Sequence, residues 1–173
     1  MSRFTTTLQV MTTVAFTASS ACLSIATATA DPNSADVNTL AAVLSKGYSL
    51  SNCAAQPVSA GVLAQIACNQ NADPSGPAGA QYFLYSGADG PATTFKALAS
   101  GGNLTVTNCG DSQSPTSWQQ GGSTAGQVVC GTVPGQGNAA QITWTTDAKN
   151  VLSFVRASNS DVASLYKWWL ANG

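Results

Sequence analysis

The sequence predicts an α+β fold, in which an antiparallel sheet of six to seven strands carries helices packed against one face. Short runs with apolar residues, bounded by glycine- and proline-rich turns, predict the strands. Three segments with apolar residues at helical spacing predict the helices. The chain also contains two similar halves, each with its own pair of cysteines, which suggests an internal duplication within a single domain.

The first 30 residues have the three-part plan of a secretory signal peptide. Arg3 is their only charged residue, a mildly apolar stretch covers residues 8–25, and the small residues of the sequence ATA precede the expected cleavage point. We therefore expect cleavage after Ala30. The remaining residues, 31–173, would form one disulfide-containing domain that is secreted and has no membrane span after cleavage.

Two alternatives remain open for this leader. It could be retained as a membrane anchor, although its many threonines and serines dilute the apolar stretch. Cys22 could instead receive a lipid after cleavage at Ala21. Lipoprotein signals usually carry an aliphatic residue three positions before that cysteine, where this chain has Ser19. Export of a free, secreted protein is the interpretation that we favour.

The helices are placed by their apolar spacing and their end signals. One helix is expected over residues 38–46, with Ser34 as its N-cap and Gly47 at its end. A second opens at Asp89 and Pro91, and the last covers residues 161–171 after a cap at Asn159 or Ser160. The runs predicted as strands are residues 48–53, 62–69, 80–86, 103–109, 126–133, 140–146 and 151–158.

Three pairs of short motifs carry the similarity between the two halves. SNC at 51–53 matches TNC at 107–109, QIACN at 65–69 matches QVVCG at 127–131, and AGAQYFLYS at 78–86 matches NAAQITWTT at 138–146. Each half then continues into a helix, with an additional strand-like run in the second half. Coincidence is the alternative explanation, because matches this short arise easily.

The four cysteines after the leader read as two disulfides in an exported chain. Four cysteines allow three pairings, and the repeat favours Cys53–Cys68 and Cys109–Cys130, because a unit duplicated whole would carry its own pair. Each bond closes a short loop, which is worth about 3 kcal/mol in the chain-entropy model. A zinc site is disfavoured, since the chain has no histidine and no Cys-x-x-Cys spacing. We expect no metal and no cofactor.

Four segments together resemble a known group of exported domains. VNTLAAVLSKGYSLSNC, the DPSGP loop, ITWTTD and LYKWW look like a small exported mycobacterial domain, found in stand-alone secreted proteins and in the extracytoplasmic C-terminal segments of some serine/threonine kinases. The resemblance covers nearly all of residues 33–172. It implies no assigned activity and supplies no functional residues. The chain itself has no Gly-rich loop with a partner lysine, and it lacks the histidine of a kinase catalytic loop.

Composition argues against several classes of function. The net charge is −1 with six cations and no basic stripe, so nucleic acid is a poor partner. The absence of histidine excludes Ser-His-Asp and Cys-His relays, and oxidised cysteines cannot act as thiol nucleophiles. Asp pairs could cleave glycosides, but the candidates all occupy turn or cap positions. These candidates are Asp73, Asp89, Asp111, Asp147 and Asp161. We expect no enzymatic activity, with an Asp-dependent hydrolase as the remote alternative.

A binding or sensor-like module of the cell envelope is the preferred interpretation, with an unknown protein, peptide, glycan or lipid as its partner. The alternative is a secreted structural or host-interacting protein without a small ligand. Aromatic side chains are the usual anchors of exported binding domains. Trp118 lies in the polar sequence SPTSWQQGG, which we expect to be a loop. Its side chain is either tucked beneath this loop, the interpretation that we favour, or displayed as a binding residue. Tyr82 and Tyr85 are expected on opposite faces of one strand, and one of these faces would line a groove.

The C-terminal sequence LYKWWLANG places two of the four tryptophans side by side. On a helix, Trp169 falls on one apolar stripe with Leu165 and Tyr166, whereas Trp168 lies on its flank. We therefore expect Trp169 to anchor the last helix to the sheet. Trp168 would be either a half-buried brace or an exposed binding residue, and it is the main candidate for recognition.

Overall fold

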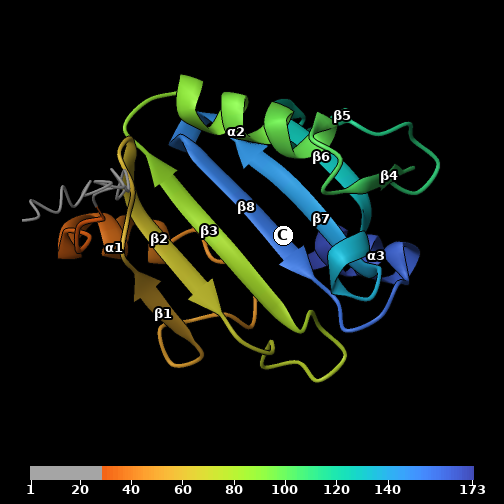
Figure 1. Ribbon diagram of the computed structural model, residues 1–173, viewed down its shortest axis with the longest axis horizontal. Helices are drawn as coiled ribbons and strands as arrows, with labels where there is room; N and C mark the ends of the chain where they lie inside the picture. The colour runs from red at the N-terminus through yellow and green to blue at the C-terminus, as the bar shows by residue number, and fades with distance from the viewer. Residues whose placement is uncertain (1–28) are drawn as a thin grey trace, which may run out of the picture.

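A computed structural model describes residues 29–173, which form one β-sheet with three helices packed against it (Figure 1). Residues 1–28 lie outside the described part, and with them Cys22 and almost all of the expected signal peptide. The helices are α1 (Ser34–Ala41), α2 (Asp89–Ser100) and α3 (Val162–Asn172), with short 3-10 turns at Pro134–Gln136 and Asp147–Lys149. The strands are β1 (Cys53–Gln56), β2 (Val62–Cys68), β3 (Gly79–Tyr85), β4 (Thr105–Thr107), β5 (Thr116–Gln120), β6 (Ser123–Val133), β7 (Ala139–Thr146) and β8 (Val151–Arg156).

All eight strands belong to one antiparallel sheet. Seven of them follow the order β1-β2-β3-β8-β7-β6-β4, and β5 pairs with β6 beside this path. The last strand of the chain, β8, therefore lies at the centre between β3 and β7. This arrangement confirms the predicted α+β class and the antiparallel sheet, with more strands than the sequence predicted.

Both predicted disulfides are present. Cys53 and Cys68 are directly opposite each other on β1 and β2, with a Cα–Cα distance of 3.9 Å. Cys109 follows β4 and joins Cys130 on β6, at a Cα–Cα distance of 5.3 Å. Each half of the chain thus contains its own disulfide, as the repeat predicted.

The two halves share their strand faces but not their register. Cys68 is paired with Ala80 in the first half, whereas Cys130 is paired with Ile142, two residues beyond the matching position, in the second. A shift of two residues keeps every side chain on its original face of a strand. Matching residues of the two halves therefore lie on the same face of their strands, although they pair with different residues of the neighbouring strand.

One face of the sheet, here named the closed face, is covered by α1 and α3. Its strand residues are buried: Tyr82 and Ile142 have 0 % exposure, and Trp144 has 3 %. Leu40 of α1 and the α3 residues Leu165 and Trp169 pack onto them. This layer is the main hydrophobic core, which confirms Trp169 as the residue that docks the last helix.

The opposite face, here named the open face, carries Gln81, Phe83, Gln141, Phe154 and Arg156. Only α2 packs against it, through Phe95 and Leu98, in a second cluster with Leu152 and Val129. In Figure 1 this helix crosses one end of the sheet and leaves the middle and the other end of the strands uncovered in that view. Helices were predicted on one face of the sheet, and α1 and α3 do share a face. Helix α2 lies on the opposite face, where its apolar residues pack against Leu152 and Phe83.

Three local predictions are corrected by the structure. The first helix starts earlier than expected, after an Asn33 N-cap that accepts from the Ala35 amide, and it ends at Ala41. Residues 48–52 form turns rather than a strand, because Asn52 holds them. Its Oδ1 accepts from the Ser49 amide at 2.9 Å, and its Nδ2 donates to the Gly47 carbonyl at 2.9 Å.

The third correction concerns the segment around Trp118, which is strand β5 and not a loop. β5 pairs with β6 in a hairpin closed by Gly121 and Gly122, whose φ angles are 61° and 82°. Two successive residues at positive φ make the tight turn that suits the twist of a hairpin, and glycine adopts this conformation without a steric penalty. This strand was missed from the sequence because SPTSWQQGG is polar, and an exposed edge strand needs few apolar residues.

The helices of the described residues are too short or too polar to cross a membrane.

Candidate functional site

Tyr82 lies inside the protein, so its predicted role as a surface binding residue is wrong. Its side chain has 0 % exposure and packs edge-on against Trp144 at 6.3 Å between ring centroids. Its hydroxyl oxygen accepts a hydrogen bond from the Ser45 amide at 3.2 Å. Burial raises the pKa of Tyr82 above the usual value for tyrosine. The prediction failed because both faces of β3 are apolar, and sequence alone did not say which would be covered.

Tyr85 is also largely enclosed, with 9 % exposure beneath the first turns of α2. Its hydroxyl donates to Thr94 Oγ1 at 3.0 Å, which ties the end of β3 to the helix. Its edge reaches a shallow depression of about 480 Å³ that is bordered by Gly61, Gly87 and Asp89. Tyr85 thus joins sheet to helix, and its contribution to binding stays a prediction.

Trp118 is half-buried on β5 and belongs to an aromatic cluster with α3. Its indole Nε1 donates to the Thr145 carbonyl at 2.8 Å, and its ring meets Trp169 edge-on at 5.6 Å. A depression of about 470 Å³ lies beside it, bordered by Tyr166, Trp169 and the exposed Leu170. The indole N–H is hydrogen-bonded within the protein, so it is not free to bind a ligand.

Trp168 is half-buried, as the brace interpretation expected. Its ring meets Tyr48 edge-on at 6.4 Å, and Tyr48 in turn contacts the buried Tyr82 at 6.3 Å. The exposed side of Trp168 borders a cavity of about 220 Å³ together with the loop residues Pro74 and Ser75. Its proposed role in recognition therefore stays a prediction, restricted to this small cavity.

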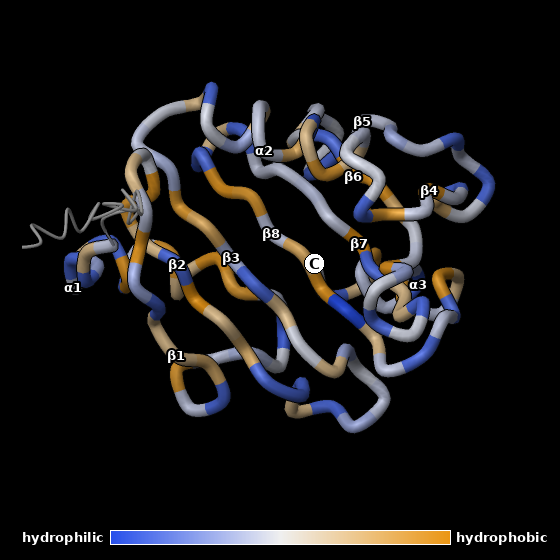
Figure 2. The backbone as a smooth tube through the Cα atoms, in the orientation of Figure 1, coloured by the Kyte–Doolittle hydropathy of each residue, from blue (hydrophilic) through white to orange (hydrophobic). Residues whose placement is uncertain are grey.

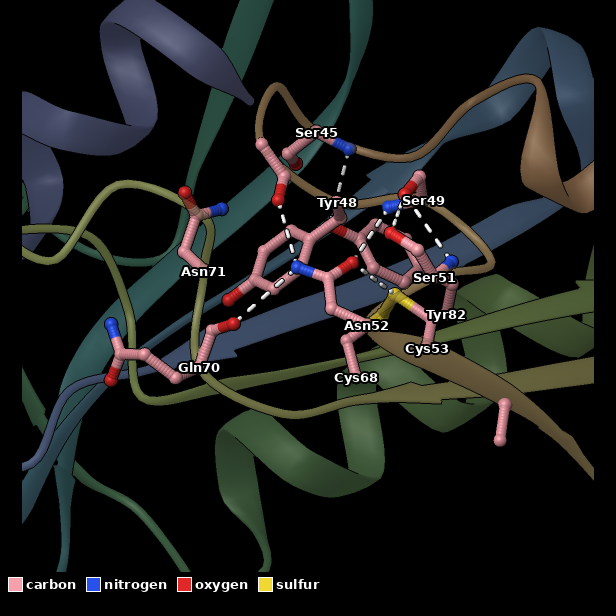
Figure 3. Close-up of a disulfide and its surroundings, with 12 residues drawn as sticks. Ser45, Tyr48, Ser49, Ser51, Asn52, Cys53, Cys68, Gln70, Asn71 and Tyr82 are labelled. Carbon is pink, nitrogen blue, oxygen red and sulfur yellow. Dashed lines mark hydrogen bonds between the residues drawn. A yellow bond between two sulfur atoms is a disulfide. The ribbon is translucent and has the colours of Figure 1, made fainter.

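Hydrogen bonds from Asn52 join two loops beside the Cys53–Cys68 disulfide (Figure 3). Figure 3 shows Asn52 between two loops, with its amide nitrogen directed at the backbone carbonyls of Gly47 and Gln70. Tyr48 and Tyr82 lie beside it, and burial raises the pKa of Tyr48. The raised pKa keeps the phenol of Tyr48 protonated at neutral pH, and the Asn52 contacts join the two loops beside the disulfide.

Asp73 and Asp161 behave as the turn and cap residues that the sequence predicted. Asp73 Oδ1 accepts from the Ser75 amide and hydroxyl, and Asp161 accepts from the Ser164 amide and hydroxyl at the start of α3. These hydrogen bonds lower the pKa of both carboxyl groups. A general acid needs a raised pKa, so neither carboxyl is tuned for glycoside cleavage. In residues 29–173, no group of three or more metal-ligating side chains comes together.

Arg156 was not selected from the sequence, yet it is the only charged residue within the strands of the described chain. It ends β8 on the open face, opposite Gly79 of β3 and Gln141 of β7. Figure 2 shows the largely hydrophobic tube of β8 becoming hydrophilic at this end. Because Gly79 has no side chain, the space on that side of the guanidinium stays open. The signal available in the sequence was a lone arginine two residues after Phe154, which places both on one face.

Glutamine side chains fix the guanidinium in place. Nε and Nη2 donate to Gln141 Oε1 at 3.2 and 2.7 Å, and Nη1 donates to Gln136 Oε1. Gln141 is itself held, since its Nε2 donates to Thr143 Oγ1 at 3.0 Å and only 5 % of the residue is exposed. The guanidinium carbon also lies over the Phe154 ring, 5.3 Å from its centroid.

The charge of Arg156 is not neutralised by these contacts. Its hydrogen-bond partners in the described part of the chain are neutral amides, and no carboxylate contributes to its titration. Partial burial lowers the pKa of Arg156, because the charged form is less well solvated there than in water. A cation held in this way has an unmet preference for an anion.

Two concave regions meet at Arg156 and Phe154, and together they are named here the open-face groove. The larger, about 410 Å³, lies between the end of α2, the turn after β6 and the sheet. Its lining comprises Leu98, Gly102, Asn103, Leu104, Val133, Pro134, Gly135, Gln136 and Gln141, besides the two shared residues. The smaller, about 230 Å³, lies toward β2 and β3 and is bordered mainly by alanines and glycine. Small-molecule sites are typically concave and apolar with a few fixed polar groups, and the groove has this composition.

Comparison of the chain with known proteins found no matching family model, no matching curated protein and no matching solved structure. The site is therefore interpreted from its own geometry.

Proposed function

We propose that this protein is an exported, non-enzymatic binding module of the cell envelope, and that its ligand occupies the open-face groove. The two disulfides are consistent with an extracellular protein, and they support the secretion inferred from the first 30 residues. The resemblance to exported mycobacterial domains points to the same compartment. Cleavage after Ala30 and release as a secreted protein are part of this proposal.

The observation that carries the proposal is the un-neutralised Arg156, which borders both parts of the groove. Partly burying a cation costs solvation free energy, which an apolar residue of similar size at this strand position would avoid. The guanidinium is oriented by Gln136, Gln141 and Phe154, and none of these residues neutralises its charge. A fixed donor group within a concave, largely apolar surface is the arrangement that small-ligand sites use.

The lining of the groove favours binding over catalysis. Neither concave region is lined by a carboxylate, lysine, serine or tyrosine, and the one cysteine at its border, Cys68, is in a disulfide. A reaction that needs a general base or a nucleophile has no side chain to provide it there. The groove can hold, orient and partly desolvate a ligand, and these are the tasks of a binding or sensor-like domain.

A blocking substitution tests the proposal. Gly135 borders the larger concave region, and a Cβ added there meets no atom within 4 Å, so Gly135→Leu should add a bulky side chain at the border of the groove without a clash. Gly87→Leu is the matched control, because a Cβ at Gly87 also meets no atom within 4 Å and it lies beside α2, away from the groove.

The experiment is a screen of sugars, peptides and lipids by thermal shift, with two-dimensional amide NMR to locate binding. We expect at least one class to raise the melting temperature of the parent protein and of Gly87→Leu, but not of Gly135→Leu. If no compound binds, or if binding is unaffected by Gly135→Leu, the proposal is wrong. Absence of all binding would favour the structural or host-interacting alternative.

A further inference from the structure

We infer that the open-face groove recognises a monocarboxylate with an apolar body, in which the carboxylate pairs with Arg156. This inference rests on the proposed binding function and specifies the chemistry of its ligand. It follows from the unused donors of the guanidinium, from the charge of the groove and from the lining on either side of Phe154.

The first step is a count of donors on Arg156. A guanidinium has five N–H groups, one on Nε and two on each Nη. Gln141 takes one from Nε and one from Nη2, and Gln136 takes one from Nη1. Two donors therefore remain, one on each terminal nitrogen. A carboxylate has two acceptor oxygens and can take one N–H from each terminal nitrogen.

The second step concerns the amount of charge. Arg156 is the only charged residue that borders either concave region of the groove. A ligand with a single negative charge would neutralise it, whereas a doubly charged phosphate would leave one charge uncompensated in a partly desolvated place. The charge of the groove therefore favours a carboxylate over a phosphate monoester.

The third step concerns the rest of the ligand. The larger region presents apolar side chains beside Phe154, contributed by Leu98, Leu104, Val133 and Pro134. Its volume of about 410 Å³ is in the usual range for sites of small organic ligands. An alkyl chain or a ring attached to the carboxylate would bury apolar surface here, while its charged end reaches Arg156.

The fourth step concerns the protein contacts that hold the guanidinium. The glutamine contacts and the Phe154 ring restrict the guanidinium, and Thr143 restricts Gln141. A group held in its binding orientation loses less conformational freedom when the ligand binds. We therefore expect replacement by lysine to weaken binding, although it keeps the positive charge, because an ammonium cannot make the paired contact.

The test compares octanoate with octanamide, which share their chain and differ in charge, by isothermal titration calorimetry on the disulfide-bonded protein. We expect octanoate to bind more tightly by about tenfold or more. Arg156→Gln should remove this preference, and Arg156→Lys should reduce it, because lysine keeps the charge but not the paired contact. Lys149→Gln is the matched control for loss of one cation, because it lies beyond the other end of β8 and should keep the preference. Melting temperatures without ligand show which variants are folded.

A second pair of probes distinguishes the sources of the carboxylate. N-acetyl-leucyl-leucine and its C-terminal amide represent a peptide end, and octanoate represents a fatty acid. Binding of only one of the two acids assigns the source and supports the inference. Phe154→Leu, which keeps the charge and an apolar surface, should weaken acid and amide alike.

The outcomes separate the two proposals. If an acid and its amide bind equally and both are lost in Gly135→Leu, the groove is a binding site but the carboxylate inference is overturned. The inference is also overturned if neither acid binds, whichever other ligand does. If no compound of any kind binds in the groove, both proposals fail.

Discussion

The two faces of the central sheet are made from the same strands but differ in how completely helices cover them. On the closed face, Tyr82, Ile142 and Trp144 are sealed beneath α1 and α3, and none is exposed by more than 3 %. On the open face, Phe83 and Phe154 are only half-buried, because α2 covers just one end. Successive side chains of a strand point to opposite faces of the sheet, so apolar residues occur on both faces here. The positions of the helices determine which face is buried in the core.

The largest effect should come from removing the anchor of the closed face. Trp169 has 4 % exposure and contacts Trp118, Trp144 and Tyr166 at centroid distances of 5.6 to 5.8 Å. We expect Trp169→Ala to lower the free energy of unfolding by about 3–5 kcal/mol, since it leaves a cavity beneath α3. Urea denaturation followed by circular dichroism measures this change.

Its neighbour Trp168 is the matched comparison, because the same residue type is half-buried there. Trp168→Ala should cost about 1.5 kcal/mol, in proportion to the smaller apolar area that it buries. Equal losses for the two variants would show that both tryptophans are core residues, and would remove Trp168 from the candidates for recognition.

The next effect concerns the disulfides, which fasten β1 to β2 and β4 to β6. They close loops with sequence separations of 15 and 21 residues. The chain-entropy model gives similar values for loops of these lengths, about 3 kcal/mol each. Double Cys→Ala variants of each pair should therefore be destabilised to a similar degree. A loss confined to one pair would show that strain or residual structure, rather than loop length, determines their contribution.

A smaller, pH-dependent effect distinguishes the closed face from the open one. Burial raises the pKa of Tyr82 and Tyr48 above the ordinary value of 10.0, so the unfolded chain loses these protons at lower pH than the folded protein. The stabilisation is complete below pH 10 and declines as the pH rises above it. Tyr82 alone should contribute a decline of at most about 1.4 kcal/mol per pH unit, reached where the unfolded chain has lost this proton and the folded protein keeps it.

Urea denaturation between pH 8 and pH 11, values chosen at about two units below and one above that pKa, measures this slope. Tyr82→Phe should reduce it, because phenylalanine has no proton to lose, while keeping the ring contacts with Trp144. An unchanged slope in Tyr82→Phe would assign the alkaline loss to other groups.

The smallest effect belongs to the open face. Phe83 is half-buried and lies 6.3 Å from Phe154 between ring centroids. We expect Phe83→Ala to lower the free energy of unfolding by about 1 kcal/mol, because water already reaches part of the ring. A loss as large as that of Trp169→Ala would show that the open face is a second core and would weaken its assignment as a binding surface.

Much of the fold could be predicted because its signals are local. The apolar runs of β2, β3, β7 and β8 and the end signals of α2 and α3 lie within each segment. The segment containing Trp118 was missed, since β5 is a polar edge strand whose pairing depends on β6 and on a Gly-Gly turn. The turns before Cys53 were missed for a similar reason, because Asn52 joins residues from two loops.

The candidate site was less predictable than the fold. Sequence reasoning selected aromatic residues, and two of the four, Tyr82 and Tyr85, are enclosed by helices. Arg156 was visible as a lone cation in a strand-like run, but its surroundings were not. Gln136 and Gln141 are 20 and 15 residues away in the chain, and only the β7–β8 register brings them to the guanidinium.

The sequence by itself determined which side chains share a face of each strand, which cysteines form disulfides and where most elements begin and end. These properties depend on periodicity and on neighbouring residues. Only the tertiary structure decided that α2 crosses to the face opposite α1 and α3, and that β8 lies at the centre of the sheet. Those decisions depend on contacts between distant segments, and they place Arg156 in an open groove instead of the core.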